Sequence, residues 1–128
     1  MNLKFEKEVE DVRGKIFFFS HKDKQVNLLE MKKGFSRGGH YHEFDSIHIM
    51  IAGKVEYCEE NLDTKKEKIE VIVPPKIIFT PSRNAHILTA LEDTIFLEVF
   101  EQKYHAIEYP KYRTIVEDKM KRLENNED

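Results

Sequence analysis

The sequence predicts an all-β fold, an antiparallel sandwich or barrel, with one short α-helix at its C-terminal end. Many short runs rich in β-branched and aromatic residues are separated by turn residues, and no stretch between them has the length and period of a crossover helix. At 128 residues the chain is expected to form one domain. Nine Phe and five Tyr residues supply apolar surface for a core, which argues against disorder throughout.

Ten segments are predicted as strands, each bounded by turn residues or by a change of polarity. They cover residues 1–9, 15–20, 26–31, 40–42, 47–52, 55–59, 68–73, 76–80, 86–90 and 94–101. The first alternates imperfectly between apolar and polar residues, and the second contains an aromatic run at residues 16–19. Gly and Pro residues mark turns at 13–14, 38–39 and 74–75. This succession favours antiparallel sheets over a parallel sheet.

The pattern changes after Pro110, where apolar residues begin to recur at helical spacing between charged ones. These apolar residues are Tyr112, Ile115, Val116, Met120 and Leu123. Proline is tolerated in a first helical turn, so we predict a helix over residues 111–123, followed by an acidic tail. We expect its apolar stripe to pack on the barrel or on a second subunit. Residues 1–109 are assigned to the barrel, and 110–128 to a helix and tail of the same domain.

Composition excludes several classes of protein. A formal charge of −3 and a pI of about 6.1 argue against a general nucleic-acid binder. No apolar run approaches the roughly 18 residues of a membrane span, and the first ten residues lack the apolar region of a secretory signal. The single cysteine, Cys58, excludes an internal disulfide and a zinc ribbon. We therefore expect a cytoplasmic protein whose partner is a small molecule, with no nucleic acid and no membrane.

Three histidines are placed in a way that points to chemistry. His40 and His42 are two residues apart, so on a strand both imidazoles lie on one face. Neutral imidazole is a good ligand for Zn, Cu, Fe and Ni. His86 follows a predicted strand and a turn, and the fold can return it to the same interior. The alternative is that the three rings face a substrate or form hydrogen bonds in the core, with no metal.

The spacing of these residues resembles the two-part signature of the cupins. The first part is matched in spacing by Gly34, His40-Tyr41-His42, Ser46 and Gly53. The second part is matched by Pro75, Pro81, Arg83, His86 and Ala90. The resemblance covers roughly residues 13–100. It implies a double-stranded β-helix, or jelly roll, with a site inside the barrel. It also implies a homodimer, for which residues 16–19 and the C-terminal helix are candidate contacts.

The chain departs from the cupin pattern at several positions. Ser46 stands where many cupins carry a metal-binding glutamate, and Pro75, Arg83 and Ala90 replace the usual Gly, Gly and Asn. His48 lies two residues beyond Ser46, on the same expected face, and is a candidate fourth ligand. The resemblance therefore implies a divalent transition metal (Zn, Ni, Fe or Cu). Its proposed ligands are His40, His42, His48 and His86.

Two short motifs resemble those of cupins that act on nucleotide-linked keto-sugars. They are Asp11-Val12-Arg13-Gly14 and Arg37-Gly38-Gly39-His40-Tyr41-His42. Relatives of this kind are ketoisomerases, epimerases and the cupin domain of the capsule-synthesis epimerase–reductase. The resemblance implies an isomerase in carbohydrate biosynthesis, with a base that removes the acidic proton α to a keto group.

The site residues of such an isomerase follow from the same resemblance. His40 or His42 is the implied base, because imidazole titrates near neutral pH. A histidine bound to a metal cannot also be a free base, so a metal at both rings requires a base elsewhere. Arg37 and Tyr57 are the implied substrate-binding residues; a solvated surface arginine is the alternative for Arg37. The tyrosines that could return the proton are Tyr41, Tyr57 and Tyr104.

Two other functions stay open at this point. One is a metal-dependent cupin of the dioxygenase type, which needs open coordination positions and a redox metal. The other is a non-enzymatic cupin that binds a small molecule, an alternative favoured by Ser46 in place of the usual glutamate.

Overall fold

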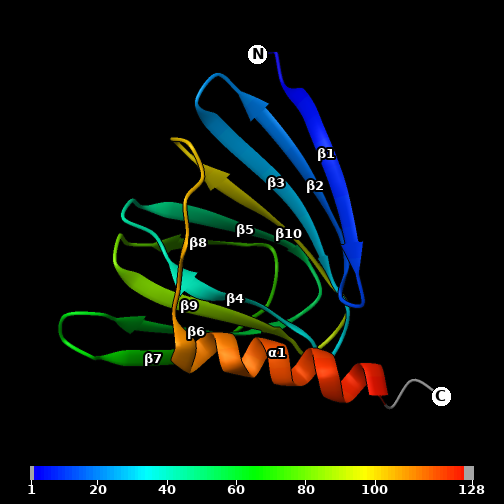
Figure 1. The fold of residues 1–128 in the computed structure, drawn as a ribbon, viewed down its shortest axis with the longest axis vertical. Coiled ribbons are helices and arrows are strands. Elements are labelled where there is room, and N and C mark those ends of the chain that lie inside the picture. Colours follow the sequence, from blue (N-terminus) through cyan, green and yellow to red (C-terminus); the bar gives the residue numbers. More distant parts are fainter. Residues whose placement is uncertain (1, 126–128) are drawn as a thin grey trace.

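The computed structural model describes residues 2–125 and consists of strands followed by one C-terminal helix (Figure 1). The strands are β1 (Lys4–Asp11), β2 (Gly14–His21), β3 (Lys24–Met31), β4 (Ser36–Tyr41), β5 (Ser46–Ala52), β6 (Val55–Asn61), β7 (Glu67–Ile72), β8 (Lys76–Thr80), β9 (Asn84–Ala90), β10 (Thr94–Phe100) and β11 (Ile107–Glu108). The helix α1 spans Pro110–Asn125. The side chain of Leu123 and the predicted tail at 126–128 lie outside the described residues.

The strands form two antiparallel sheets that face each other (Figure 1). The order in the six-stranded sheet is β1-β2-β3-β10-β5-β8, and the order in the five-stranded sheet is β11-β4-β9-β6-β7. Neighbouring strands are far apart in sequence, as when β10 lies between β3 and β5. Two sheets joined by such long crossings form a jelly roll. The prediction of an all-β jelly roll with a C-terminal helix is confirmed.

The start of β4 differs most from its predicted position, residue 40, and one further strand, β11, was not predicted. Gly38 and Gly39 suggested a turn, but β4 runs through them with a bulge in its pairing to β9. Both have positive φ, and a Cβ on Gly39 would lie 2.7 Å from the Cα of Arg113 in α1. These glycines therefore let β9 and α1 approach β4 closely. The strand β11 has only two residues, too few for any periodicity.

The core has two parts, one between the sheets and one beneath the helix. Leu29, Met50 and Phe96 belong to the inter-sheet cluster. Tyr112 and Val116 of α1 are buried against Cys58, Ala85 and Ile87 on the outer face of the five-stranded sheet. The helix thus packs on the barrel, the first of the two expected positions, and Cys58 is the small buried residue of that contact. Within residues 2–125, no helix has the length and apolar character needed to cross a membrane.

The first two strands differ from the rest of the six-stranded sheet. Every residue of β1 is exposed, and Figure 1 shows β1 and β2 standing away from the five-stranded sheet. Side chains on their inner face, such as Lys7 and Phe18, line a cavity, and Ile16 both lines it and packs against the edge of the inter-sheet core. The inner face of β1 and β2, which stand away from the five-stranded sheet, therefore forms one wall of the candidate site.

Candidate metal centre and adjoining cavity

Three histidines from two neighbouring strands meet inside the barrel. His40 lies near the end of β4 and is paired across the sheet with His86 of β9, while His42 follows directly after β4. The ring centroids of His40 lie 4.9 Å from those of both His42 and His86, and the last two are 5.5 Å apart. One ring nitrogen from each residue lies within 4.8 Å of the other two. The structure thus brings together the three rings singled out in the sequence.

The free nitrogens of this cluster are its most informative feature. The Nε2 atoms of His40, His42 and His86 are buried and have no hydrogen-bond partner in the described part of the chain. The Nδ1 of His42 lies 2.8 Å from the carbonyl oxygen of His105, and that of His86 lies 3.2 Å from the carbonyl oxygen of Asn84. A carbonyl oxygen only accepts, so both Nδ1 atoms carry the proton. Each Nε2 then presents a lone pair, as a metal ligand must.

Burial keeps these rings neutral. It lowers the pKa of His40 to about 4, despite the opposing influence of Glu98. Burial also lowers the pKa of His42, and it holds the pKa of His86 well below the usual value. Neutral imidazole is the form that coordinates a metal, whereas imidazolium cannot. The residues present therefore fit a divalent transition metal of the kind that prefers nitrogen ligands.

His48 lies beside the trio, its Nε2 is likewise buried without a hydrogen-bond partner among residues 2–125, and its role as a fourth ligand stays a prediction. It comes from β5 of the opposite sheet, and its ring centroid is 5.2 Å from that of His86. Its Nε2 lies 3.6 Å from a carboxylate oxygen of Glu98, and its Nδ1 lies 3.5 Å from the hydroxyl of Thr80. His48 is thus the neighbour of a carboxylate as well as of the three-histidine cluster.

Glu98 is the site residue that the sequence analysis missed. It lies on β10 and is paired in register with His48 on one side and Asn27 on the other. Its carboxylate accepts a hydrogen bond from the Asn27 amide at 3.3 Å, and the oxygen of that amide accepts one from Gln25 at 3.0 Å. Although burial opposes it, the nearby His48 and the Asn27 hydrogen bond contribute to a lowered Glu98 pKa. The carboxylate is therefore ionised at neutral pH.

A signal for Glu98 was present in the sequence. In the β10 segment the inward residues are Phe96, Glu98 and Phe100, so one acidic residue interrupts an apolar face. Ser46, at the usual glutamate position, is buried on the neighbouring β5, and its hydroxyl lacks a partner among residues 2–125. The structure therefore has its buried carboxylate one strand away from the position of the family motif.

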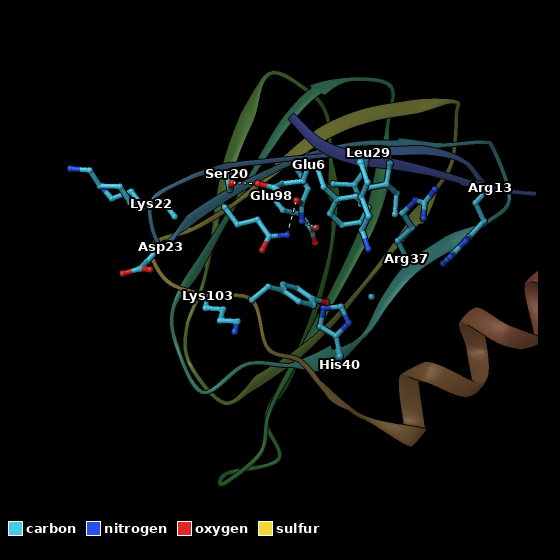
Figure 2. A pocket seen from close by; sticks show the side chains of 18 of the residues that line it. Glu6, Arg13, Ser20, Lys22, Asp23, Leu29, Arg37, His40, Glu98 and Lys103 are labelled. Atoms are coloured by element: carbon cyan, nitrogen blue, oxygen red, sulfur yellow. Dashed lines mark hydrogen bonds between the residues drawn. The ribbon is translucent and has the colours of Figure 1, made fainter. Parts of the chain in front are cut away.

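A cavity of about 860 Å³ connects this region to the surface (Figure 2). Figure 2 shows His40 and Glu98 reaching into it from opposite sheets. Basic residues predominate in its lining over acidic ones, although the whole chain has an excess of acids. The basic residues are Lys7, Arg13, Lys22, Lys24, Arg37, Lys103 and Arg113, and the acidic ones are Glu6, Asp23 and Glu98. Its size and charge suit a small anionic molecule.

The remaining predicted site residues fall in different places. Arg37 lines the cavity and is buried, with its Nε donating to the carbonyl oxygen of Glu30 at 2.9 Å; the alternative of a solvated surface arginine is therefore wrong. Burial lowers its pKa to about 10, so it keeps its charge at neutral pH. Tyr57 is fully buried and hydrogen-bonded to Glu59 and Thr80, and it is not among the described residues that line the cavity.

Of the three candidate tyrosines, Tyr104 is the one at the cavity. It lines the cavity wall, and its ring centroid lies 5.6 Å from that of His42. Burial raises its pKa to about 12, so its hydroxyl holds a proton at neutral pH. Tyr41 packs instead against the cluster beneath α1.

Comparison with solved structures finds the same fold in proteins of low sequence identity. An oxalate decarboxylase, described for its substrate binding mode and a switch of reaction specificity, has a TM-score of 0.73 and 18% identity over 80% of this chain and 30% of its own. CapF in complex with the inhibitor 3-isopropenyl-tropolone has a TM-score of 0.67 and 16% identity over 81% of this chain and 31% of its own.

A third structure, the formate complex of Lactobacillus farciminis oxalate decarboxylase, has a TM-score of 0.71 and 20% identity over 85% of this chain and 35% of its own. The chain thus spans about a third of the length of these proteins. No protein-family model matches the sequence, and no curated protein matches it. The chain has the cupin fold, as the resemblance over residues 13–100 predicted.

Proposed function

We propose that this chain is a metal-binding cupin that acts on a small anionic molecule, and that its reaction is the isomerisation or epimerisation of a nucleotide-linked keto-sugar. The observation that carries the metal site is the set of three buried, partnerless Nε2 atoms of His40, His42 and His86. A buried nitrogen without a partner costs stability, and a bound cation would remove that cost. The donor set favours Zn, Ni, Fe or Cu.

A divalent metal at these histidines would supply Lewis acidity, polarising a carbonyl oxygen of the substrate. If the three rings are ligands, none of them is a free base. Glu98 then becomes the proposed base, because its ionised carboxylate faces the cavity and is held in place by Asn27. A carboxylate in this position can accept the proton α to a keto group. Tyr104 is the proposed donor of the returning proton, since its hydroxyl lies at the same cavity.

The basic lining supports a phosphorylated or carboxylated substrate. Arg37 is proposed to bind a diphosphate, with its guanidinium already fixed by the carbonyl oxygens of Glu30 and Gly14. Lys22, Lys24 and Lys103 lie in the outer part of the lining and would attract an anion to the mouth. The cavity volume of about 860 Å³ is within the range of small-molecule sites and leaves room for more than a sugar.

A small organic acid is a second candidate substrate, favoured by the same basic lining. Two of the three structural neighbours described above are oxalate decarboxylases, one of them in complex with formate. In this case the activity would be a metal-dependent reaction of a carboxylate, and Arg37 would bind the carboxylate instead of a diphosphate.

Metal analysis of untagged protein tests the proposal first. We expect about one divalent transition metal ion per chain, and a loss of metal affinity of at least about 100-fold in His40→Ala and His86→Ala. His21→Ala is the matched control, because His21 lies on β2 and hydrogen-bonds the backbone of Asn2 instead of joining the trio. Protein without bound metal that also fails to take up Zn, Ni, Fe or Cu would refute the metal site.

The reaction is tested separately in deuterated water. A 4-keto sugar nucleotide should exchange its α-proton in the presence of the metal-loaded protein, and UDP or dTDP should raise the melting temperature. Turnover of oxalate or a related acid, without exchange of the sugar nucleotide, would favour the organic-acid candidate. Metal binding with no turnover of either substrate would leave a non-enzymatic binding protein.

A further inference from the structure

Glu59 is a buried carboxylate inside the barrel that the proposed reaction does not use. It lies on β6, opposite His86 of β9 in the pairing of these strands, and it is only 7% exposed. It is not among the described residues that line the cavity, so a substrate in the cavity does not reach it. A buried carboxylate is costly unless its oxygens accept hydrogen bonds, and both oxygens of Glu59 do so.

The direction of one of these bonds is set by the turn after β6. The side-chain oxygen of Asn61 accepts from the backbone N–H groups of Asp63 and Thr64, each at 2.9 Å. The amide nitrogen of Asn61 is therefore the group that donates to the side-chain oxygen of Asn84, at 2.9 Å. This fixes the orientation of the Asn84 amide, whose nitrogen donates to Oε2 of Glu59 at 2.9 Å.

The other bond begins a chain that reaches the opposite sheet. The hydroxyl of Tyr57 donates to Oε1 of Glu59 at 2.6 Å. A tyrosine has one hydroxyl proton, so at the 2.7 Å contact between Tyr57 and Thr80 of β8 the threonine is the donor. Thr80 has then used its only proton, and it must accept at its 3.5 Å contact with Nδ1 of His48. Each donor in this chain points towards Glu59, because a carboxylate only accepts.

The consequence for His48 is a fixed tautomer. Burial raises the pKa of Tyr57, as does the hydrogen bond to Glu59, so the hydroxyl proton that orders the chain is retained at neutral pH. His48 must then carry its own proton on Nδ1, and its buried Nε2 presents a lone pair. The nearest carboxylate oxygen of Glu98 is 3.6 Å from this Nε2, beyond the distance of a good hydrogen bond. The nitrogen is therefore available to a metal.

Glu59 also supports His86. The amide of Asn84 is held between Asn61 and Glu59, and the backbone carbonyl oxygen of the same asparagine lies 3.2 Å from Nδ1 of His86. One carboxylate thus supports a histidine in each of the two sheets. Partners of this kind, bonded to the nitrogen that does not bind the metal, fix the tautomer and ring orientation of metal-ligating histidines.

We propose that Glu59 is a positioning residue of the metal centre. Through Tyr57 and Thr80 it holds His48 with the proton on Nδ1 and with Nε2 free to bind a metal. This role rests on the metal site of the proposed function, but the tautomer of His48 is a property of the metal-free protein and is measured without the metal. It also gives a role to Tyr57, which was expected to bind substrate but is enclosed away from the cavity.

Nitrogen-15 NMR of histidine-labelled, metal-free protein tests the proposal first, with the His48 signals assigned from His48→Gln. Wild-type protein should show His48 with its proton on Nδ1. In Tyr57→Phe the hydroxyl of Thr80 is released and can donate to Nδ1 of His48, so the ring proton should move to Nε2. Thr80→Val removes the acceptor and should cause the same change, whereas Thr80→Ser keeps the hydroxyl and should keep the wild-type tautomer.

The affinity for Zn²⁺, measured by competition with a chelator, is the second readout. It should fall by about 10- to 100-fold in Tyr57→Phe and in Glu59→Gln, because a glutamine has one oxygen and cannot accept from both Tyr57 and Asn84. The matched control is Tyr112→Phe, which removes an equally short bond from a buried tyrosine to Glu67, beneath the helix α1. This control should keep the His48 tautomer and change the affinity by less than about threefold.

Three results would each overturn the proposal. They are a wild-type His48 with its proton on Nε2, a tautomer unchanged in both Tyr57→Phe and Thr80→Val, and an equal loss of Zn²⁺ affinity in Tyr112→Phe. Far-UV circular dichroism reports the fold of every variant, and the two Thr80 variants decide if Tyr57→Phe does not fold. Wild-type protein that binds no metal but shows the expected tautomer changes would refute the proposed function and still support the control of His48 by Glu59.

Discussion

The two faces of the six-stranded sheet reverse the pattern expected of a soluble β-protein. On three adjacent central strands the inward residues are Asn27, Glu98 and His48, paired across the sheet. Their immediate neighbours in sequence, which point outward, are all apolar: Val26 and Leu28, Leu97 and Val99, Ile47 and Ile49. Polar groups are therefore inside and apolar groups outside over the same short stretch of three strands.

Each half of this reversal is unfavourable in an isolated chain. Buried polar side chains lose the free energy of their hydration by water. Exposed apolar side chains lose the free energy of burial, which is roughly 25 cal/mol for each Å² of apolar surface. A sequence tolerates such local conflicts where function requires them. The inner row adjoins the three-histidine cluster and belongs to the proposed site, whereas the outer rows leave apolar side chains facing away from it. Substituting alternate residues on one strand separates the contributions of the two faces.

The largest expected effect comes from the inner row. Glu98→Gln keeps the shape and the Asn27 contact but cannot accept a proton, so the α-proton exchange rate should fall by about 10²- to 10⁴-fold. Its outward neighbour offers an isosteric control, since Val99→Thr should retain the rate. The rate is measured by mass spectrometry of the sugar nucleotide in deuterated water, with metal content determined for both variants. An unchanged rate in Glu98→Gln would remove Glu98 as the base.

The next effect is the pH dependence of the metal-free protein. The pKa of His40 is about 4 in the fold, against the usual 6.5, because burial disfavours the charged ring. Between these values the unfolded chain holds more protons than the native chain, so stability that is complete above pH 6.5 is lost as the pH falls towards 4. The expected loss from this group is about 3 kcal/mol. The free energy of unfolding, measured with urea at each pH, should fall less steeply with decreasing pH in His40→Gln than in the wild type. An equally steep fall in the two proteins would contradict the prediction.

A smaller effect is expected at the cavity wall. Arg37→Lys retains a positive charge but loses the planar fork, so the KM for a nucleotide-linked substrate should rise by about 10- to 100-fold with little change in kcat. Lys22→Ala, at the outer part of the same cavity, should change KM by less than about threefold, because exposed charges are screened. Equal changes in KM at the two positions would show that Arg37 acts only by adding to the positive electrostatic potential of the cavity.

The sequence predicted the fold and half of the site because both depend on local spacing. Short apolar runs and turn residues defined most strands, and the two-residue spacing of His40 and His42 placed both rings on one face. Only the fold brings His86 close to these two rings, and its position there was predicted from the cupin resemblance. Glu98 could not be placed in this way, since its relation to His48 is a pairing between strands about fifty residues apart. No local pattern encodes that register.

The orientation of side chains was similarly beyond local spacing. Tyr57 and Tyr104 are chemically equivalent in the sequence, but Tyr57 is enclosed by Glu59 and Thr80, whereas Tyr104 comes from the segment after β10 that borders the cavity. The sequence left Arg37 open to a surface or a buried role, and the structure buries it against the backbone of Gly14 in β2 and Glu30 in β3. These assignments depend on the packing of two sheets, which the sequence alone does not specify.

The smallest expected effect lies on the outward-facing side of the six-stranded sheet. Ile77→Ala should change the free energy of unfolding by less than about 0.5 kcal/mol, since Ile77 is 65% exposed. The adjacent Ile78 points into the inter-sheet core, is only 5% exposed, and should cost about 2–5 kcal/mol when changed to alanine. Urea unfolding of the two variants measures both values. Similar losses at the two positions would mean that the outward-facing row is packed within the single chain, and the contrast between the two faces of the sheet would then not hold.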